Sequence, residues 1–170
     1  MDERKFVVDR MLGRLVTWLR ILGYDTLYIK DVRFIFKEED DLLLLIAKSC
    51  NRILVTRDRA LSQRARRYGL YYHYMRSDKV MEQLGELSHV YGMKLEPKMI
   101  RCSICNKIIR RSDLCNDKRL LESDYVPKWM IEDGADFWIC DRCDKVYWQG
   151  SHWDNVRRAL RELENKLEYV

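Results

Sequence analysis

In the segments Phe6-Val7-Val8-Asp9 and Ile53-Leu54-Val55-Thr56-Arg57-Asp58, a short apolar run ends close to an aspartate. Short runs rich in β-branched residues are typical of buried strands in a parallel sheet. Open parallel sheets gather their functional groups just beyond the carboxyl ends of their strands. If the two runs are neighbours in one sheet, they carry two carboxylates to the same edge, where a hard divalent cation finds the oxygen ligands that it prefers.

Helical periodicity separates these apolar runs. Apolar residues recur at the spacing of an amphipathic helix at Leu12, Leu15, Val16, Leu19 and Leu22. The same reasoning along the chain predicts strands at 5–8, 25–29, 53–55 and 70–75. It predicts helices over 11–22, from the acidic run before Leu42 to about residue 49, over 59–68 and over 80–91. This alternation predicts an α/β fold in which helices cover both faces of a parallel sheet.

The composition is that of a folded globular protein. The chain has 170 residues, of which 47% are hydrophobic, enough for one ordinary domain or for a small domain with a metal-stapled module. No apolar stretch approaches the ~20 residues of a membrane span, and the charged N-terminus lacks the apolar segment of a signal peptide. We therefore expect a cytoplasmic protein with no membrane partner.

The net charge of +5 lies in the first part of the chain. Residues 1–95 hold 18 Lys and Arg against 13 Asp and Glu, whereas residues 96–170 hold 14 of each kind. A basic face on the first part would attract a polyanion such as RNA or DNA. A charge that only serves solubility is the plainer interpretation of the same numbers.

Four of the six cysteines form two C-x-x-C pairs, Cys102 with Cys105 and Cys140 with Cys143. In a reducing compartment, paired spacing favours a metal over disulfides. Four thiolates complete a tetrahedral shell, so we predict a structural zinc ion with no open catalytic position. A redox role for the pairs fits less well, because neither pair opens a helix after a strand.

The composition changes near Glu96-Pro97, where we place a domain boundary. The prediction is a sheet domain over 1–95 and a zinc ribbon with a C-terminal helix over 96–170. That helix is expected over 154–169, packed back across the ribbon, because apolar residues recur at helical spacing at Val156, Leu160, Leu163 and Leu167.

Three aspartates form the candidate catalytic site. Asp9 and Asp58 follow strands, and Asp40 lies at the start of the predicted second helix. Each could instead be a helix N-cap, which is the commoner role of an aspartate before a helix. Three crowded carboxylates repel one another and need a cation, and Mg²⁺ or Mn²⁺ suits oxygen ligands. Asp41 and Glu39 are alternatives to Asp40.

Basic residues near the same edge are candidate RNA contacts. We expect Arg10, Arg14, Arg57 and Arg59 to bind nucleic-acid phosphates, and Arg64, Arg66 and Arg67 to extend the basic region along the third helix. A solvated helix face explains this helix about equally well. Thr56 is expected to bond a carboxylate or a phosphate, or to be only a β-branched strand residue.

Several blocks of the chain resemble the Mut-seven C-terminal RNase family. These blocks are Phe6 to Gly13, Trp18 to Asp25, Arg52 to Asp58 and Tyr147 to Trp153. The resemblance implies a PIN-like nuclease domain followed by a four-cysteine zinc ribbon, with Asp9, Asp40 and Asp58 at the acidic positions. The match at Asp40 is the least specific, because four acidic residues stand in a row from Glu38 to Asp41. The role of His152, inside the last block, stays open.

These observations predict a metal-dependent ribonuclease. It would bind Mg²⁺ or Mn²⁺ at the aspartates, use a metal-bound water as nucleophile, and leave a 5′-phosphate and a 3′-hydroxyl, as the resemblance implies. The zinc ribbon would position RNA, a ribosome or a protein partner. Two rival hypotheses are a non-catalytic RNA-binding or ribosome-associated module and a module that binds only proteins.

Overall fold

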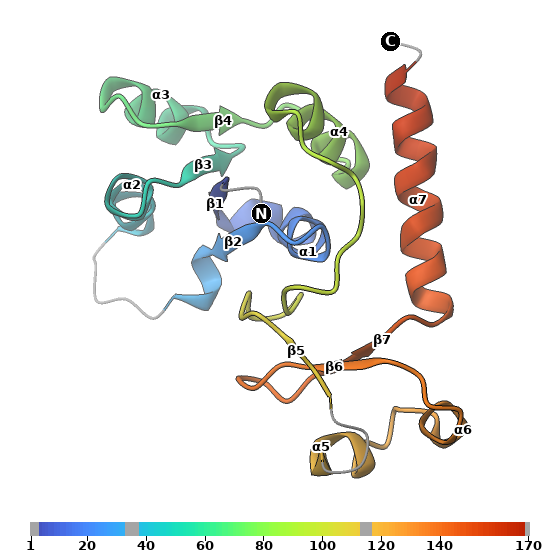
Figure 1. Cartoon of the computed structure of the whole chain (residues 1–170). Helices are drawn as coiled ribbons and strands as arrows, with labels where there is room; N and C mark the ends of the chain where they lie inside the picture. Colours follow the sequence, from blue (N-terminus) through green and yellow to red (C-terminus); the bar gives the residue numbers. More distant parts are fainter. Residues whose placement is uncertain (1–3, 33–37, 113–116, 169–170) are drawn as a thin grey trace.

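The computed structural model describes residues 4–32, 38–112 and 117–168. Its larger sheet is fully parallel, in the order β2-β1-β3-β4 (Figure 1). The strands are β1 (Lys5–Val8), β2 (Asp25–Tyr28), β3 (Ile53–Thr56) and β4 (Tyr72–Tyr74). The α/β fold class is therefore confirmed, and β1 and β3 are direct neighbours, with Val8 beside Val55.

Helices cover both faces of this sheet. They are α1 (Gly13–Ile21), α2 (Glu39–Ser49), α3 (Arg59–Arg67), α4 (Val80–Tyr91) and the C-terminal α7 (Ser151–Glu168). Phe6 and Val8 pack with residues of α1, α4 and α7, whereas Val7 packs with residues of α2 and α3. Because alternate side chains of a strand face opposite sides, a strand covered on both sides is apolar throughout, which explains the uninterrupted runs in the sequence.

The helix that we predicted over 11–22 is divided. A 3₁₀ turn, η1 (Arg10–Leu12), precedes α1. The Tyr28 hydroxyl donates a hydrogen bond to the Arg10 carbonyl (2.9 Å). Gly13 leaves room for that ring, since a Cβ at this position would lie 2.8 Å from the Tyr28 hydroxyl oxygen. A second 3₁₀ turn, η2 (Ile29–Asp31), ends β2 one residue earlier than expected.

The second sheet is small and antiparallel, in the order β5-β6-β7. Its strands are β5 (Arg110–Arg111), β6 (Phe137–Ile139) and β7 (Val146–Trp148). Two short helices, α5 (Lys118–Leu121) and α6 (Lys128–Glu132), occupy the long interval between the cysteine pairs. They pack on a separate apolar cluster that includes Leu120, Val126 and Phe137.

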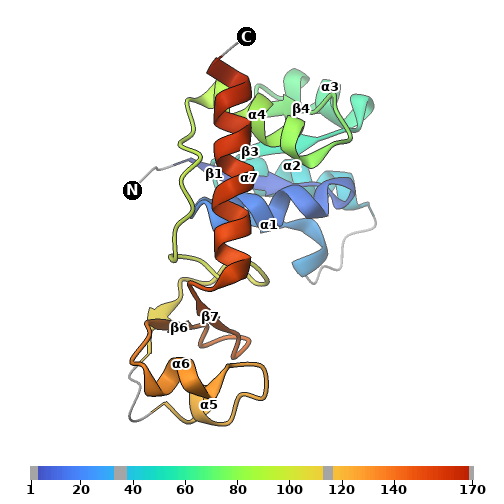
Figure 2. The ribbon, with the colours of Figure 1, turned by 90° about the vertical axis from the view of Figure 1, so that its right-hand side faces the viewer.

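The C-terminal helix does not pack across the ribbon as we had expected. Instead α7 lies along α4, on the side of α1 and α4 that faces away from the strands (Figures 1 and 2). Val156, Leu160 and Leu163 are buried in the same cluster as Phe6. Gly85 of α4 allows a close approach, because a Cβ there would lie 3.2 Å from a Leu163 methyl carbon.

Polar contacts also join the first cysteine knuckle to the sheet. Arg20, which is 2% exposed, donates hydrogen bonds to the carbonyls of Thr26 (3.0 Å) and Ile104 (2.6 Å). Asn106 donates to the Asp25 carboxylate (2.8 Å) and accepts from the Thr26 N–H (3.0 Å). The ribbon is therefore held against β2 by groups that have little access to water.

Asp25 is the charged centre of this junction. Burial alone would raise the pKa of Asp25, but hydrogen bonds from Arg52 and Asn106 and the positive charges of Arg52 and Arg101 outweigh it and lower the pKa. The carboxylate is thus held ionised between the two sheets.

Among the described helices, none combines the length and the hydropathy needed to cross a bilayer.

Candidate functional site

The carboxyl ends of β1 and β3 bring Asp9 and Asp58 to one edge of the parallel sheet. The Asp9 N–H donates to the Val55 carbonyl (3.1 Å), which continues the pairing of the two strands by one residue. Asp58 lies two residues beyond the end of β3 and directly precedes α3. The strand order therefore places both groups where open parallel sheets carry their sites.

Asp9 is buried and both of its carboxylate oxygens are bonded. Its side chain is 5% exposed. One oxygen accepts the Met11 N–H (2.6 Å), which makes Asp9 the cap of η1. The other oxygen accepts the hydroxyl of Thr56. The N-cap interpretation of Asp9 is thus confirmed, and so is the expected bond between Thr56 and a carboxylate.

Thr56 links Asp9 to Asp58. Its hydroxyl donates to Asp9 and accepts the N–H of Asp58 (2.9 Å). The Asp58 side chain in turn accepts the Leu61 N–H (2.9 Å) and caps α3. One oxygen of Asp58 carries this cap, and the residue is exposed. A short polar chain therefore fixes the relative positions of the two aspartates.

Asp40 has a different local role. The cap position of α2 belongs to Glu38, and Asp40 lies in the first turn of the helix without a capping bond. Burial raises the pKa of the Asp40 carboxyl, and the charges of Asp58 and Asp9 raise it further, while Arg64 acts in the opposite direction. The repulsion shows that the three aspartates share one electrostatic environment.

The alternatives to Asp40 are engaged in ion pairs. Asp41 pairs with Arg64, whose guanidinium also lies 3.6 Å from the Asp40 carboxylate. Glu39 accepts hydrogen bonds from Arg10 (3.1 Å). The pKa of Asp40 is raised by the charges of both Asp58 and Asp9.

The aspartates are less tightly gathered than the cysteines. The ligand atoms of the four cysteines all lie within 4.8 Å of one another. In the described ranges, no other group of three or more metal-ligating side chains is gathered this closely. Mg²⁺ keeps several of its waters in protein sites, so a looser set of carboxylates suits this ion better than it would suit zinc. Carboxylate oxygens are the kind of ligand that a hard dication prefers.

The arginines expected to contact RNA come shortly after the carboxyl ends of β1 and β3 in the chain. Arg10 follows Asp9 directly, and Arg57 and Arg59 flank Asp58. Arg14 is exposed on the first turn of α1, and Arg59 is exposed at the start of α3. Arg10 pairs with Glu39 through Nε and Nη2, which leaves the N–H groups of Nη1 for a phosphate.

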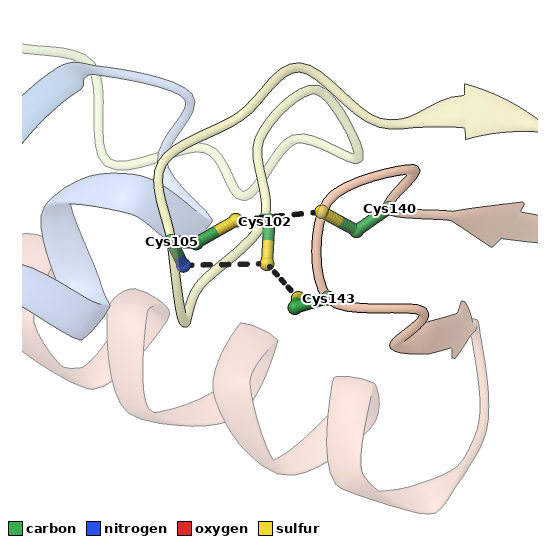
Figure 3. A group of neighbouring side chains, drawn as sticks. All are labelled: Cys102, Cys105, Cys140 and Cys143. Atoms are coloured by element: carbon green, nitrogen blue, oxygen red, sulfur yellow. Dashed lines mark hydrogen bonds between the residues drawn. The ribbon is translucent and has the colours of Figure 1, made fainter.

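The four cysteines come together between two facing loops (Figure 3). The sulfurs of Cys102 and Cys143 are 3.4 Å apart, as are those of Cys105 and Cys140. Zn–S bonds of about 2.3 Å place tetrahedral sulfurs about 3.8 Å apart. The donor set and its spacing therefore fit a zinc ion, and the group closes all four positions.

The knuckle turns use residues other than glycine. Asn106 (φ 66°) and Asp144 (φ 55°) have left-handed backbones after the second cysteine of each pair. Asn and Asp are the non-glycine residues that adopt this conformation most readily. Asn106 gains a further role, because its side chain makes the bonds to β2 described above.

Comparison with known families comes to the same architecture. A family model described as the Mut7-C RNAse domain matches residues 4–160. The chain belongs to this family. The match spans the parallel sheet, the cysteine ribbon and most of α7, so membership assigns an RNA-related nuclease function to the whole arrangement. Neither the comparison with curated proteins nor that with solved structures finds a match.

Two residues of this Mut7-C RNAse domain have roles that the sequence did not indicate. Arg64, which we expected to extend the basic region along the third helix, pairs with Asp40 and Asp41 across α2 and α3. Tyr147 donates or accepts a hydrogen bond at the Cys102 sulfur (3.1 Å). No pattern signals either contact, because each depends on how two distant segments meet.

Tyr147 also affects the thiols of the Mut7-C ribbon. Burial raises the pKa of Cys102, but hydrogen bonds from the Tyr147 hydroxyl and from backbone N–H groups overcome it and lower the pKa to about 7. Burial raises the pKa values of Cys105 and Cys143, and their bonds to neighbouring cysteines raise them further. The Cys102 thiolate is stabilised while Cys105 and Cys143 resist ionisation, as expected of a cluster that needs a cation.

Proposed function

We propose that this protein hydrolyses RNA phosphodiester bonds at the sheet edge formed by Asp9, Asp40 and Asp58, with Mg²⁺ or Mn²⁺ as cofactor. The observation that supports the proposal most is the raised pKa of Asp40, caused by burial and by the charges of Asp58 and Asp9. Repulsion among carboxylates that a neighbouring arginine offsets only in part is common where a protein binds a cation or handles protons.

The residues divide into three roles in this proposal. The carboxylates of the three aspartates hold the dication, and Thr56 keeps Asp9 and Asp58 in register. When bound, the dication supplies an activated water and offsets charge that grows on the phosphate. Arg57 and Arg59 bind neighbouring phosphates of the strand. Hydrolysis forms a bond from the water oxygen to phosphorus, breaks the P–O3′ bond and moves a proton to the 3′ oxygen.

The test compares cleavage of a fluorescent single-stranded RNA by the zinc-loaded wild type and by Asp40→Asn, with Mn²⁺ or Mg²⁺ added. Asp40 makes no capping bond, so its variant should fold. We expect the rate to fall by about two orders of magnitude or more, the usual effect of removing a group that stabilises transition-state charge. Asp9→Asn should lose activity as well, with its fold checked by circular dichroism.

The matched control is Asp124→Asn, an exposed aspartate of the ribbon far along the chain from the acidic edge. It should cleave RNA at the wild-type rate. Equal rates in the wild type and Asp40→Asn would remove Asp40 from the mechanism. RNA that stays intact with every protein at every Mn²⁺ concentration would remove the nuclease activity itself.

A second function is favoured by one specific observation. Asp9 and Asp58 both cap helices, so local structure alone accounts for their positions. A non-catalytic RNA-binding or ribosome-associated module would use the basic groups and the ribbon without cleavage. It would show RNA affinity that weakens steeply with salt and that does not depend on Mn²⁺.

A further inference from the structure

A cavity of about 300 Å³ lies where the ribbon continues into the C-terminal helix. Its walls come from the second knuckle, from β7 and from the first residues of α7. The residues that give it chemical character are Lys145, Tyr147, Trp148, Gly150, Ser151 and His152. It lies outside the acidic edge, and the ribonuclease proposal makes no use of it.

The aromatic wall is fixed before any ligand arrives. The Tyr147 hydroxyl accepts the Ser103 N–H (3.1 Å) and bonds the Cys102 sulfur, so the knuckle sets the position of its ring. Trp148 stacks on Tyr125 with ring centroids 6.2 Å apart and an interplanar angle of 27°. Ordering costs for these rings are therefore already met in the fold, which favours binding.

Gly150 keeps the cavity open next to Trp148. A Cβ at this position would lie 2.7 Å from the Trp148 indole nitrogen, a distance that ordinary contacts do not allow. Any other residue would push the indole away or fill the space beside it. The absence of a side chain at Gly150 is thus a requirement of this cavity.

The charge of the cavity suits an anion. Lys145 is its charged lining residue, and no carboxylate is among the described residues that line it. The Gly150 carbonyl accepts the N–H groups of Trp153 (2.8 Å) and Asp154 (3.2 Å), so α7 begins here. The preceding N–H groups of Ser151 and His152 have no acceptor within the helix and add positive potential at the cavity.

Two other cavities lie along α7 and include Glu96 and Glu164 in their linings. In one of them Arg157 and Arg161 balance the two carboxylates. Neither has an aromatic side chain among its described lining residues. The cavity between β7 and α7 differs from both in pairing aromatic residues with a basic group and, among the described residues that line it, no carboxylate.

We propose that this cavity binds one nucleotide of a single-stranded RNA. The base would stack on His152 and on the aromatic surface of β7, where Tyr147 and Trp148 line the cavity from opposite faces of the strand. The phosphate would meet Lys145 and the first N–H groups of α7. Stacking on aromatic side chains together with a basic group is how proteins hold unpaired nucleotides. The volume is at the small end for ligand cavities, as a single nucleotide requires. The proposal rests on the proposed function only in taking RNA as the ligand.

The test measures RNA binding separately from RNA cleavage. Zinc-loaded full-length protein carrying Asp40→Asn is titrated into a short fluorescent single-stranded RNA, without added Mg²⁺ or Mn²⁺, and anisotropy gives the Kd. Adding His152→Ala should weaken binding about fivefold or more, the range for loss of one stacking ring. Adding Lys145→Gln should weaken it and lower the slope of log Kd against log salt by about 0.7, the value for one phosphate contact on a single strand.

The fold provides a matched control for each variant. Lys107 occupies the position in the first knuckle that Lys145 occupies in the second. The Lys107 carbonyl accepts the Cys102 N–H (2.8 Å), and the Lys145 carbonyl accepts the Cys140 N–H (3.0 Å). Lys107 is exposed and does not line the cavity. Lys107→Gln should leave both Kd and slope unchanged, and so should His89→Ala on α4.

The ligand arms and the outcomes separate the possible failures. The same oligonucleotide with an abasic position, AMP and inorganic phosphate are titrated in parallel; competition by AMP but not by phosphate supports a base pocket. Equal Kd values for wild type, His152→Ala and Lys145→Gln overturn this proposal, whatever the cleavage assay shows. Weaker binding in both variants, with no cleavage by the wild type, keeps the nucleotide pocket and rejects the nuclease.

Discussion

Asp40 gives a residue-scale prediction about pH, because its pKa is raised by burial and by the charges of Asp58 and Asp9. A carboxyl with a raised pKa in the fold makes its ionised form destabilising, so the cost is present at neutral pH and disappears as pH falls through the raised pKa. Asp40→Asn should therefore stabilise the protein at pH 7 by a few tenths of a kcal/mol, since the group is partly exposed and its interactions are screened. Thermal unfolding without added Mg²⁺ measures it.

The gain should shrink as the pH falls through the raised pKa of Asp40, because the wild-type carboxyl then becomes neutral too. Asp41→Asn is the control, because Asp41 is exposed and paired with Arg64, so its loss should bring no gain. Adding Mn²⁺ at pH 7 should make the wild type more stable than Asp40→Asn, because a dication stabilises the protein that binds it more tightly. A stabilisation that persisted unchanged below the raised pKa of Asp40 would contradict an electrostatic origin.

Thr56 gives the second residue-scale prediction. Its buried hydroxyl serves the Asp9 carboxylate and the Asp58 N–H at once. Thr56→Val keeps the shape of the side chain but leaves both partners without this bond, at a cost of about 1–3 kcal/mol in the free energy of unfolding. Urea denaturation gives the value, and Thr56→Ser, which keeps the hydroxyl, should lose much less. Similar losses in the two variants would mean that packing of the methyl group matters more than the hydroxyl.

At the scale of elements, the local sequence pattern predicted where elements begin and end better than it predicted which elements pack together. The bounds of β1 and α4 agree with the structure, because an apolar run followed by Asp9 and an apolar stripe ended by Gly92 are local signals. An amphipathic stripe says that a helix buries one face but not against what, so the packing of α7 on α4 was missed. The same holds for the site. The ends of the predicted strands located Asp9 and Asp58, whereas the pairing of Arg64 with Asp40 depends on how α2 and α3 meet.

Arg20 gives the element-scale prediction, because it ties α1 to both β2 and the first knuckle. Its guanidinium bonds three carbonyls and the Asp31 carboxylate from a buried position. Arg20→Lys keeps the charge but loses the planar fork that reaches several acceptors. We expect the free energy of unfolding to fall by about 2–4 kcal/mol, in the range for breaking a buried charged network. Arg14→Lys, exposed on the same helix, should change stability by less than about 0.5 kcal/mol.

For the molecule as a whole, the fold predicts that its two sheets respond differently to the loss of zinc. The larger sheet has an extensive apolar cluster on each face, whereas the ribbon has two small clusters, one around Phe137 and one around Cys102 and Cys140. A module with so small a core needs its metal to stay folded. A strong chelator should therefore unfold the ribbon, seen as changed tryptophan fluorescence and fast amide exchange in β6 and β7, while the parallel sheet keeps its protection.

The release of zinc should depend on pH with a defined sign. Cys105 and Cys143, whose pKa values are raised, hold their protons at neutral pH, so zinc binding must displace them and its affinity should rise with pH. The dependence should steepen below about pH 7, where Cys102 also becomes protonated. A competition titration against a chelator across this range measures it, with the exposed Cys50→Ser as a control that keeps the zinc stoichiometry. If removal of zinc by a chelator made amide exchange fast in the parallel sheet as well as in the ribbon, Arg20 and Asp25 would have to couple the two sheets into one folding unit.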